Sequence, residues 1–461
     1  MKRTKRKPNT RNIALLTIIL LILGIYLYFV NYYRTHFYRS STINGINYGN
    51  QTVSEVEEHI ASDIASYSIH ISGRNDVEDV ITAQDMDYHY ISDGQVKQLK
   101  DDQNPFLWPV GLFRSNAVEM DATTTFDADL LRESMKKLLF FNETNNIAPT
   151  DAYIDYSEDD GYRIIEETYG SQVKEDVMYD ALTDAIAQNE TLLNLETIDC
   201  YTNPSITKEN EAMNAAVKKA NKYTQLTITY DFEIATETLD ASTLHEWINI
   251  SDDFEVTIDT DKVAAYVDYL GFHYTTFGIA RDFTTHDKKQ ITVSGGDYGW
   301  WINKSKEREA LLATIQEGKS VTREPEYYQT AVTHKANDIG DSYVEIDLSK
   351  QHLWVFKDGK MVVDSKLVSG NHAKKYDTPK GVYSITYKQT EAPLVGEDYD
   401  TLVHFWMPFN GNIGLHDATW RVKFGGNIYK KQGSHGCINL PYAKAKIIYQ
   451  NVEKGTPVVI Y

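Results

Sequence analysis

A cysteine near the end of the chain lies in a setting that suits nucleophilic chemistry. Cys437 belongs to the run Gly433-Ser434-His435-Gly436-Cys437-Ile438-Asn439, and His416 lies upstream at the end of an apolar stretch. A thiol with an ordinary pKa of about 8.5 needs a base close by to become a nucleophile, and His416 is the candidate base. Gly436 lets the chain turn so that its own N–H and that of Cys437 can converge on a developing oxyanion. The pattern therefore predicts acyl-transfer chemistry on a cysteine.

Two other interpretations explain these residues less well. A buried structural cysteine would give no packing reason for the Gly, His and Asn residues around it. A zinc site of His416, His435 and Cys437 would place two ligands only two positions apart, and no fourth ligand follows at the usual spacing. We therefore expect no metal and no cofactor at this site.

The chain has two cysteines, Cys200 and Cys437, which lie 237 residues apart. Because the sequence places them in different domains, we expect two free thiols rather than one disulfide. Cys200, between Asp199 and Tyr201, is predicted to be an inert, half-buried thiol. Cys437 is therefore the candidate nucleophile.

The elements that must position these residues are mostly strands. Apolar and polar residues alternate over 343–348 and 351–356, and further strands are expected at 361–368, 378–385 and 457–461. One substantial helix is expected at 442–453. The region 341–461 is thus predicted to be a mostly-β domain with the cysteine close to its end.

These residues resemble the signature of a known family. His416 followed by Ser434-His435-Gly436-Cys437-Ile438-Asn439 is similar to the L,D-transpeptidase (YkuD-type) catalytic domain, in which a histidine precedes Ser/Thr-His-Gly-Cys-x-Asn. Strand 351–356 and the turn Thr378-Pro379-Lys380-Gly381 also look like that family's opening. The resemblance covers 341–461. The chain departs from the family at Asp417, where Gly or Ser often follows the histidine, and this leaves open what orients His416.

The resemblance implies a reaction on the stem peptides of peptidoglycan, as donor and as acceptor. In the family the cysteine, here Cys437, attacks the carbonyl of the third stem residue and expels D-alanine, and an amine of a neighbouring stem then takes the acyl group. The product is a cross-link between third residues, and family members are acylated by carbapenems on this cysteine. His416 corresponds to the base. The residues expected to shape or tune the nucleophile loop are Ser434, His435, Gly436 and Asn439.

Two alternatives remain open at this point. An L,D-carboxypeptidase would use the same acyl-enzyme on Cys437 but pass the acyl group to water. A non-catalytic wall-binding scaffold would not depend on Cys437 at all. The physiological acceptor amine is also left open, as are protein partners, the oligomeric state and regulation.

The N-terminal region combines a basic tail with an apolar run. Six Lys or Arg residues and no acid occur within 1–11, and residues 13–30 are almost entirely apolar and uncharged. Eighteen residues are about the minimum that spans a bilayer, and tyrosines 26, 28, 32 and 33 lie where an aromatic belt is expected. No small-residue cleavage site follows, so the pattern favours an uncleaved anchor over a signal peptide. The positive-inside rule then places 1–12 in the cytoplasm and the rest outside.

The middle of the chain contains two similar stretches, 164–189 and 293–318, at an offset of 129 residues. Each reads as a short strand, a glycine turn and an amphipathic helix, and an aspartate upstream (Asp127, Asp259) is a plausible helix N-cap. The repeat predicts two copies of one α+β module. The opening at 41–49 also resembles peptidoglycan-binding modules of wall-associated proteins. Whether these modules bind glycan or only set a distance from the membrane is left open.

The net charge of −20 is concentrated in the middle of the chain, and the last 120 residues are slightly basic. This distribution argues against nucleic acid as a partner. We therefore predict a multidomain chain with a single transmembrane helix, in the layout of enterococcal-type members of the family. The predicted parts are a cytoplasmic tail (1–12), an anchor (13–33), two α+β modules (40–207 and 208–335) and the catalytic domain (341–461).

Overall fold

The computed structural model describes residues 10–396 and 399–461. The described residues form two compact units: the first runs up to Tyr153 and takes in Glu166–Lys208, and the second consists of Ile154–Ile165 and Glu209–Tyr461. Residues 1–9 of the predicted basic tail lie outside the described residues. The two units are taken in turn.

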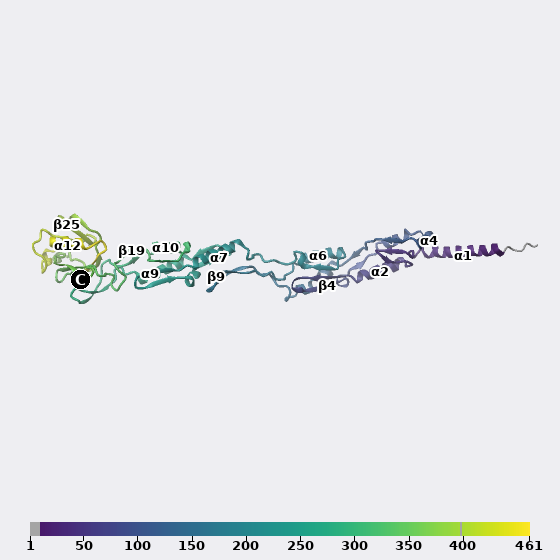
Figure 1. Ribbon diagram of the computed structural model, residues 1–461, viewed down its shortest axis with the longest axis horizontal. Coiled ribbons are helices and arrows are strands. Elements are labelled where there is room, and N and C mark those ends of the chain that lie inside the picture. The colour runs from purple at the N-terminus through teal and green to yellow at the C-terminus, as the bar shows by residue number, and fades with distance from the viewer. Residues whose placement is uncertain (1–9, 397–398) are drawn as a thin grey trace, which may run out of the picture. The chain divides into compact units, whose positions relative to one another are not determined.

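The first unit begins with the apolar helix α1 (Thr10–Tyr32), which is 23 residues long and has a mean hydropathy of 2.8 over its most apolar window (Figure 1). Length and composition make it a candidate membrane span. Most of its side chains are exposed, and Val30 is buried at its end. An unpacked helix of this kind fits a lipid environment better than a core.

The first module follows α1 within the same unit. Its core gathers around Ile69, Ile71, Leu131, Met135 and Leu182. Strands β3 and β4 pair antiparallel, and β10 pairs with β3 in parallel. The helices of this unit are α2 (Val53–Ala65), α3 (Gln95–Asp101), α4 (Trp108–Gly111), α5 (Ala128–Lys136) and α6 (Glu175–Ala187), and its strands are β1 (Ser41–Ile43), β2 (Ile46–Asn47), β3 (Ser68–Ser72), β4 (Glu78–Thr82), β5 (His89–Tyr90), β6 (Asn116–Val118), β7 (Thr124–Thr125) and β10 (Leu192–Asn194).

The second module, in the second unit, repeats this plan. Strands β11 and β12 pair antiparallel, and β18 pairs with β11 in parallel. Asp259 caps α9 just as Asp127 caps α5, each by accepting backbone N–H groups of the first turn. The helices are α7 (Glu211–Thr224), α8 (Ala241–Leu244), α9 (Thr260–Tyr274) and α10 (Lys304–Glu317), and the strands are β11 (Ile228–Asp231), β12 (Thr236–Leu239), β13 (Ile248–Ile250), β14 (Val256–Ile258), β15 (Arg281–Thr284), β16 (Gln290–Val293), β17 (Trp301–Ile302), β18 (Val321–Arg323) and β19 (Tyr327–Gln329).

One hairpin lies within the predicted range of the first module but does not pack with that module. Strands β8 (Tyr153–Ser157) and β9 (Gly161–Ile165) follow α5 in the chain, yet they pack in the second unit. Tyr162 donates its hydroxyl to His245 O and its backbone N–H to Asn221 Oδ1. The equivalent hairpin after α9, β15–β16, packs instead on the C-terminal domain. In each module, the hairpin that follows the Asp-capped helix therefore packs on a part of the chain that comes later in the sequence. The boundaries 40–207 and 208–335 stay predictions.

The C-terminal domain is built from two sheets around one core. A five-stranded sheet has the order β22-β21-β20-β28-β23, and a four-stranded sheet has the order β24-β25-β26-β27. Their inner faces and α12 bury residues such as Val344, Leu353, Met407 and Ile448. The elements are β20 (Tyr343–Asp347), β21 (His352–Lys357), β22 (Lys360–Lys366), β23 (Gly381–Ser384), β24 (Gln389–Gly396), β25 (Tyr399–Asn410), β26 (Ile413–Asp417), α11 (Tyr429–Gln432), β27 (Ile438–Leu440), α12 (Tyr442–Asn451) and β28 (Pro457–Ile460).

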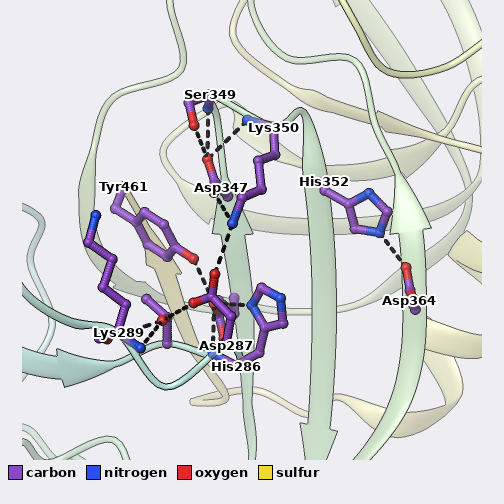
Figure 2. Close-up of polar contacts among 11 residues, drawn as sticks. His286, Asp287, Lys289, Asp347, Ser349, Lys350, His352, Asp364 and Tyr461 are labelled. Carbon is purple, nitrogen blue, oxygen red and sulfur yellow. Dashed lines mark hydrogen bonds and ion pairs between the residues drawn. The ribbon is translucent and has the colours of Figure 1, made fainter.

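A polar joint fixes the β15–β16 hairpin on the five-stranded sheet (Figure 2). The carboxylate of Glu345, which is completely buried, accepts the backbone N–H and the Nδ1 of His286 at 2.9 Å each. The His286 ring stacks on Trp354 with 3.5 Å between ring centroids. Beside it, Asp287 pairs with Lys350 at 3.2 Å.

An apolar cluster backs this joint. It combines Phe283, Val293 and Tyr298 of the second module with Ile339, Val382 and Val459. Gly296 has a φ of +87°, and a Cβ there would meet Val382 O at 2.0 Å, so the close approach needs glycine. The second module and the C-terminal domain therefore share a core.

The predicted fold class is confirmed: an apolar N-terminal helix, a repeated α+β region and a sheet-rich C-terminal domain are all present. The strands expected in 341–461 are found within a few residues of their predicted ends, and the expected helix is α12. Both cysteines are free.

Candidate active site

Cys437 immediately precedes β27, the strand at one edge of the four-stranded sheet. Gly436, at φ +120°, turns the chain into this position, and a Cβ there would approach Ile413 Cδ1 to 3.1 Å. The Cys437 thiol contacts Asn412 O at 3.5 Å. Burial raises the pKa of this thiol to about 11, so at neutral pH it is protonated.

His416 lies on the neighbouring strand β26, in register with Asn439 of β27. Its Nδ1 lies 2.9 Å from Asp417 O. A carbonyl only accepts, so Nδ1 carries the ring proton and Nε2 has a free lone pair. Burial lowers the pKa of His416, which keeps the imidazole neutral. The ring is therefore poised as a base through Nε2.

A second contact fixes the same tautomer. Arg421 Nε donates to Asn439 Oδ1 at 2.9 Å, and since Arg can only donate, this contact sets the orientation of the Asn439 amide. The other end of that amide, Nδ2, then donates to His416 Nε2 at 2.9 Å. Arg421 was not singled out from the sequence, because a lone arginine between the two motifs carries no spacing signal.

The Asp417 side chain makes its hydrogen bonds to the neighbouring strand, and its charge acts on His416 only by opposing the lowering of the His416 pKa by burial. Its carboxylate is completely buried and accepts the backbone N–H groups of His404 and Phe405 and the Nδ1 of His404. The pair raises the pKa of His404, chiefly through that side-chain hydrogen bond. The main-chain carbonyl of Asp417 orients His416, while the carboxylate of Asp417 ties β26 to the neighbouring strand β25.

The nucleophile loop is braced by hydroxyl groups. Ser434 Oγ donates to Cys437 O at 2.5 Å and accepts the Gly436 N–H at 3.1 Å. Thr378 Oγ1 donates to Gly436 O at 2.7 Å and accepts the Gly370 N–H. In this structure the Gly436 N–H is paired with Ser434 Oγ, so its convergence with the Cys437 N–H on an oxyanion would require that hydrogen bond to break and stays a prediction.

The predicted residues open onto one cavity of about 230 Å³. His435 lies on its rim, exposed, with its ring 4.8 Å from that of Tyr376. The cavity is lined by Leu394, Thr401, His416, Trp420, Arg421, Gly433, Ser434, His435, Cys437 and Asn439. Among residues 10–396 and 399–461, no three His, Cys, Asp or Glu side chains are grouped to hold a metal ion.

Comparison with known proteins bears on what this cavity does. The model of the YkuD family, described as an L,D-transpeptidase catalytic domain, matches residues 341–460. A crystal structure of a mutant of the Enterococcus faecium L,D-transpeptidase is 35% identical and is matched over 52% of this chain and 97% of that chain, with a TM-score of 0.45. The chain belongs to the L,D-transpeptidase family.

Other matches agree with this family. The family described as "Putative peptidoglycan binding domain" matches 80–192 and 206–323, which supports two copies of one module in the transpeptidase's middle region. The catalytic domain of the E. faecium L,D-transpeptidase, solved by NMR acylated by ertapenem, is 41% identical over 26% of this chain and 97% of that chain, with a TM-score of 0.25. The "Putative L,D-transpeptidase YciB" of Bacillus subtilis (strain 168) is 24% identical over 133 residues, 25% of this chain and 68% of that protein.

Proposed function

We propose that this family member is a peptidoglycan L,D-transpeptidase that uses Cys437 as its nucleophile and His416 as its base. The observation that carries the proposal is that both side chains line one cavity, with His416 Nε2 unprotonated and accepting a hydrogen bond from the Asn439 amide, which a proton from the thiol can replace. The substrates are peptidoglycan stem peptides. On this proposal the proton moves between Cys437 and His416.

The acylation step begins with a proton transfer. Cys437 Sγ rotates from Asn412 O towards the scissile carbonyl, and its proton passes to His416 Nε2. The hydrogen bond from the Asn439 amide to Nε2 breaks as Nε2 takes up this proton. The thiolate attacks the carbonyl carbon of the third stem residue. The tetrahedral intermediate collapses, its C–N bond breaks, and His416 returns the proton to the departing amine of D-alanine. A thioester on Cys437 remains.

Deacylation runs the same path in reverse with a new amine. The amine of a second stem attacks the thioester, gives up a proton to His416 and forms the new amide, and the C–S bond breaks. Cys437 leaves as a thiolate and recovers its proton from His416. Two stems are then joined between their third residues, and the enzyme is restored.

We further propose that α1 anchors the protein in the cell membrane as a single span, with the catalytic domain on the wall side. The support is the length and apolarity of α1 and the two wall-related families in the remainder of the chain. On this view 1–12 is the cytoplasmic tail.

Mass spectrometry of the full chain in detergent, incubated with disaccharide-tetrapeptide, tests the reaction. Peptide dimers that lack one D-alanine are the expected product. Release of D-alanine without dimers would show an L,D-carboxypeptidase instead, and no turnover at all would favour a wall-binding scaffold. His416→Ala should slow acylation by roughly two to four orders of magnitude.

Intact-mass analysis with a carbapenem tests the nucleophile. A single adduct is expected on the wild-type chain and none on Cys437→Ala. Cys200→Ala is the matched control, because Cys200 is the other free thiol and is completely buried. An adduct mapped to Cys200 would overturn the assignment of Cys437.

A further inference from the structure

The first unit carries an exposed apolar segment that its own core does not explain. Residues 105–113, PFLWPVGLF, contain no charged and no hydrogen-bonding side chain except the Trp108 indole. Phe113 is 91% exposed. The other large apolar side chains exposed in this segment are Phe106, Leu107, Val110 and Leu112. A contiguous apolar patch of this kind on a protein surface marks a contact with another apolar phase.

This segment is held against the anchor helix. Tyr26 donates its hydroxyl to Phe106 O at 2.9 Å, and Trp108 Nε1 donates to Tyr26 O at 3.3 Å. The Trp108 ring lies 4.7 Å from the Phe29 ring and 6.1 Å from the Tyr33 ring. Positions 26, 29 and 33 form one face of a helix, and in Figure 1 α4 lies beside the C-terminal end of α1.

The contact lies within the span, not beyond it. Tyr26 is inside the apolar run 13–30 and precedes the end of α1 at Tyr32. At 1.5 Å per residue it lies about 9 Å below that end. This is the depth, roughly 5–10 Å into the boundary between headgroups and acyl chains, at which amphipathic segments lie in membranes.

The segment is an addition to the repeated module. In the second copy, β13 and β14 are joined by residues 251–255 alone, whereas β5 and β7 are separated by 91–123. The added stretch is tied back to the chain just after α1, where Ser40 Oγ contacts Gly111 O at 2.6 Å and Arg114 O at 2.8 Å. Only the copy next to the anchor has it.

We propose that residues 105–113 form a second membrane contact, inserted in the outer leaflet beside α1, with lipid as the partner. The proposal rests on the proposed anchor and deepens it. The exposed side chains listed above enter the lipid, and Trp108 stays at the helix face with its indole N–H satisfied. With α1 it gives the first module two points of attachment, so the module is held at a set angle to the membrane rather than swivelling on one helix.

Depth-dependent fluorescence quenching tests this in the full-length protein in vesicles of phosphatidylglycerol and phosphatidylcholine. Single cysteines are introduced as Phe113→Cys, Leu21→Cys and Leu192→Cys in a background that carries both Cys200→Ala and Cys437→Ala, and each is labelled with an environment-sensitive dye. Leu192 is the matched control, because it is 73% exposed in the same unit outside the segment. Nitroxides attached to lipid acyl chains serve as quenchers.

The three positions separate the outcomes. Loss of fluorescence at 113 and at 21, with none at 192, supports the second contact. Loss at 21 alone would overturn the contact while leaving the anchor in place. No loss at 21 would overturn the anchor and this inference with it. Disulfide-linked dimers of the unlabelled Phe113→Cys protein, together with no quenching at 113 in the labelled protein, would assign the patch to a second copy of the chain and overturn the lipid assignment.

Discussion

The protonation state of Cys437 in the free enzyme can be predicted from the structure. It distinguishes an enzyme that rests with a neutral thiol from one that rests with a preformed thiolate. In this structure the Cys437 thiol contacts Asn412 O, and burial raises its pKa to about 11. Burial also lowers the pKa of His416. Both shifts favour the uncharged forms, so the free enzyme should hold a neutral thiol and a neutral imidazole. A preformed thiolate–imidazolium pair, as in some cysteine proteases, would require the opposite shifts.

The size of the effect follows from the thiolate fraction. With a pKa of about 11, that fraction at pH 7 is about 10⁻⁴, against about 3% for an ordinary cysteine of pKa about 8.5, a deficit of about 300-fold. The more basic thiolate is the better nucleophile, and a Brønsted coefficient of about 0.45 recovers about 13-fold. Alkylation of Cys437 by iodoacetamide at pH 7 should therefore be about 20-fold slower than that of an exposed cysteine.

The shape of the pH profile is the sharper measurement. The alkylation rate should rise about tenfold per pH unit from pH 6 to about pH 10 without a plateau. Peptide mapping must read Cys437 separately, because burial also raises the pKa of Cys200 to about 11. His416→Ala should leave this profile nearly unchanged while slowing acylation by substrate. A rate already level above about pH 6, lost in His416→Ala, would refute a neutral resting pair.

Two further predictions concern positioning. Asn439→Ala removes one hydrogen bond to Nε2 of His416 but leaves the contact of its Nδ1, so acylation should slow by about tenfold, much less than in His416→Ala, as measured by stopped-flow carbapenem acylation. A loss as large as that of His416→Ala would contradict this order. Glu345→Ala leaves the donors of His286 unpaired and should lower the free energy of unfolding, measured by denaturant titration, by about 1–3 kcal/mol per unpaired group. The control Asp364→Ala, at an exposed position, should change this free energy little.

The reacting pair could be predicted from the sequence because it depends on residue types at fixed spacing. His416 lies on β26 and Cys437 immediately precedes the adjacent strand β27, and both line one cavity. The group that orients His416 could not be predicted, since it is a main-chain carbonyl, which every residue has. Arg421 acts through an amide on another strand, and only the register of β26 and β27 reveals that path. The roles of the site residues themselves stay predictions until the variants above are measured.

The middle region was predictable as a repeat but not in its packing. The offset between 164–189 and 293–318 follows from helix and turn patterns within one copy, which are local. Which part of the chain each hairpin packs against is determined by tertiary contacts, and a local sequence pattern does not show these. Nothing in the β8–β9 sequence distinguishes packing on its own module from packing on the next one, because the apolar face is the same in either case. The membrane contact proposed for residues 105–113 could likewise not be predicted from the sequence, because it is inferred from the contact of this segment with α1.

The β15–β16 hairpin explains how the C-terminal domain is held on the second module without a flexible linker. β15–β16 contributes Phe283 and Val293 to a core shared with the C-terminal domain, and its turn places His286 on the buried Glu345. Separating the hairpin from the sheet would expose this apolar cluster and would leave the Glu345 carboxylate without its donors on His286. Motion of the domain at this joint therefore costs more free energy than bending a Gly/Ser-rich linker. The Cys437 cavity is therefore held on a packed support, and its placement depends on buried contacts rather than on chain length.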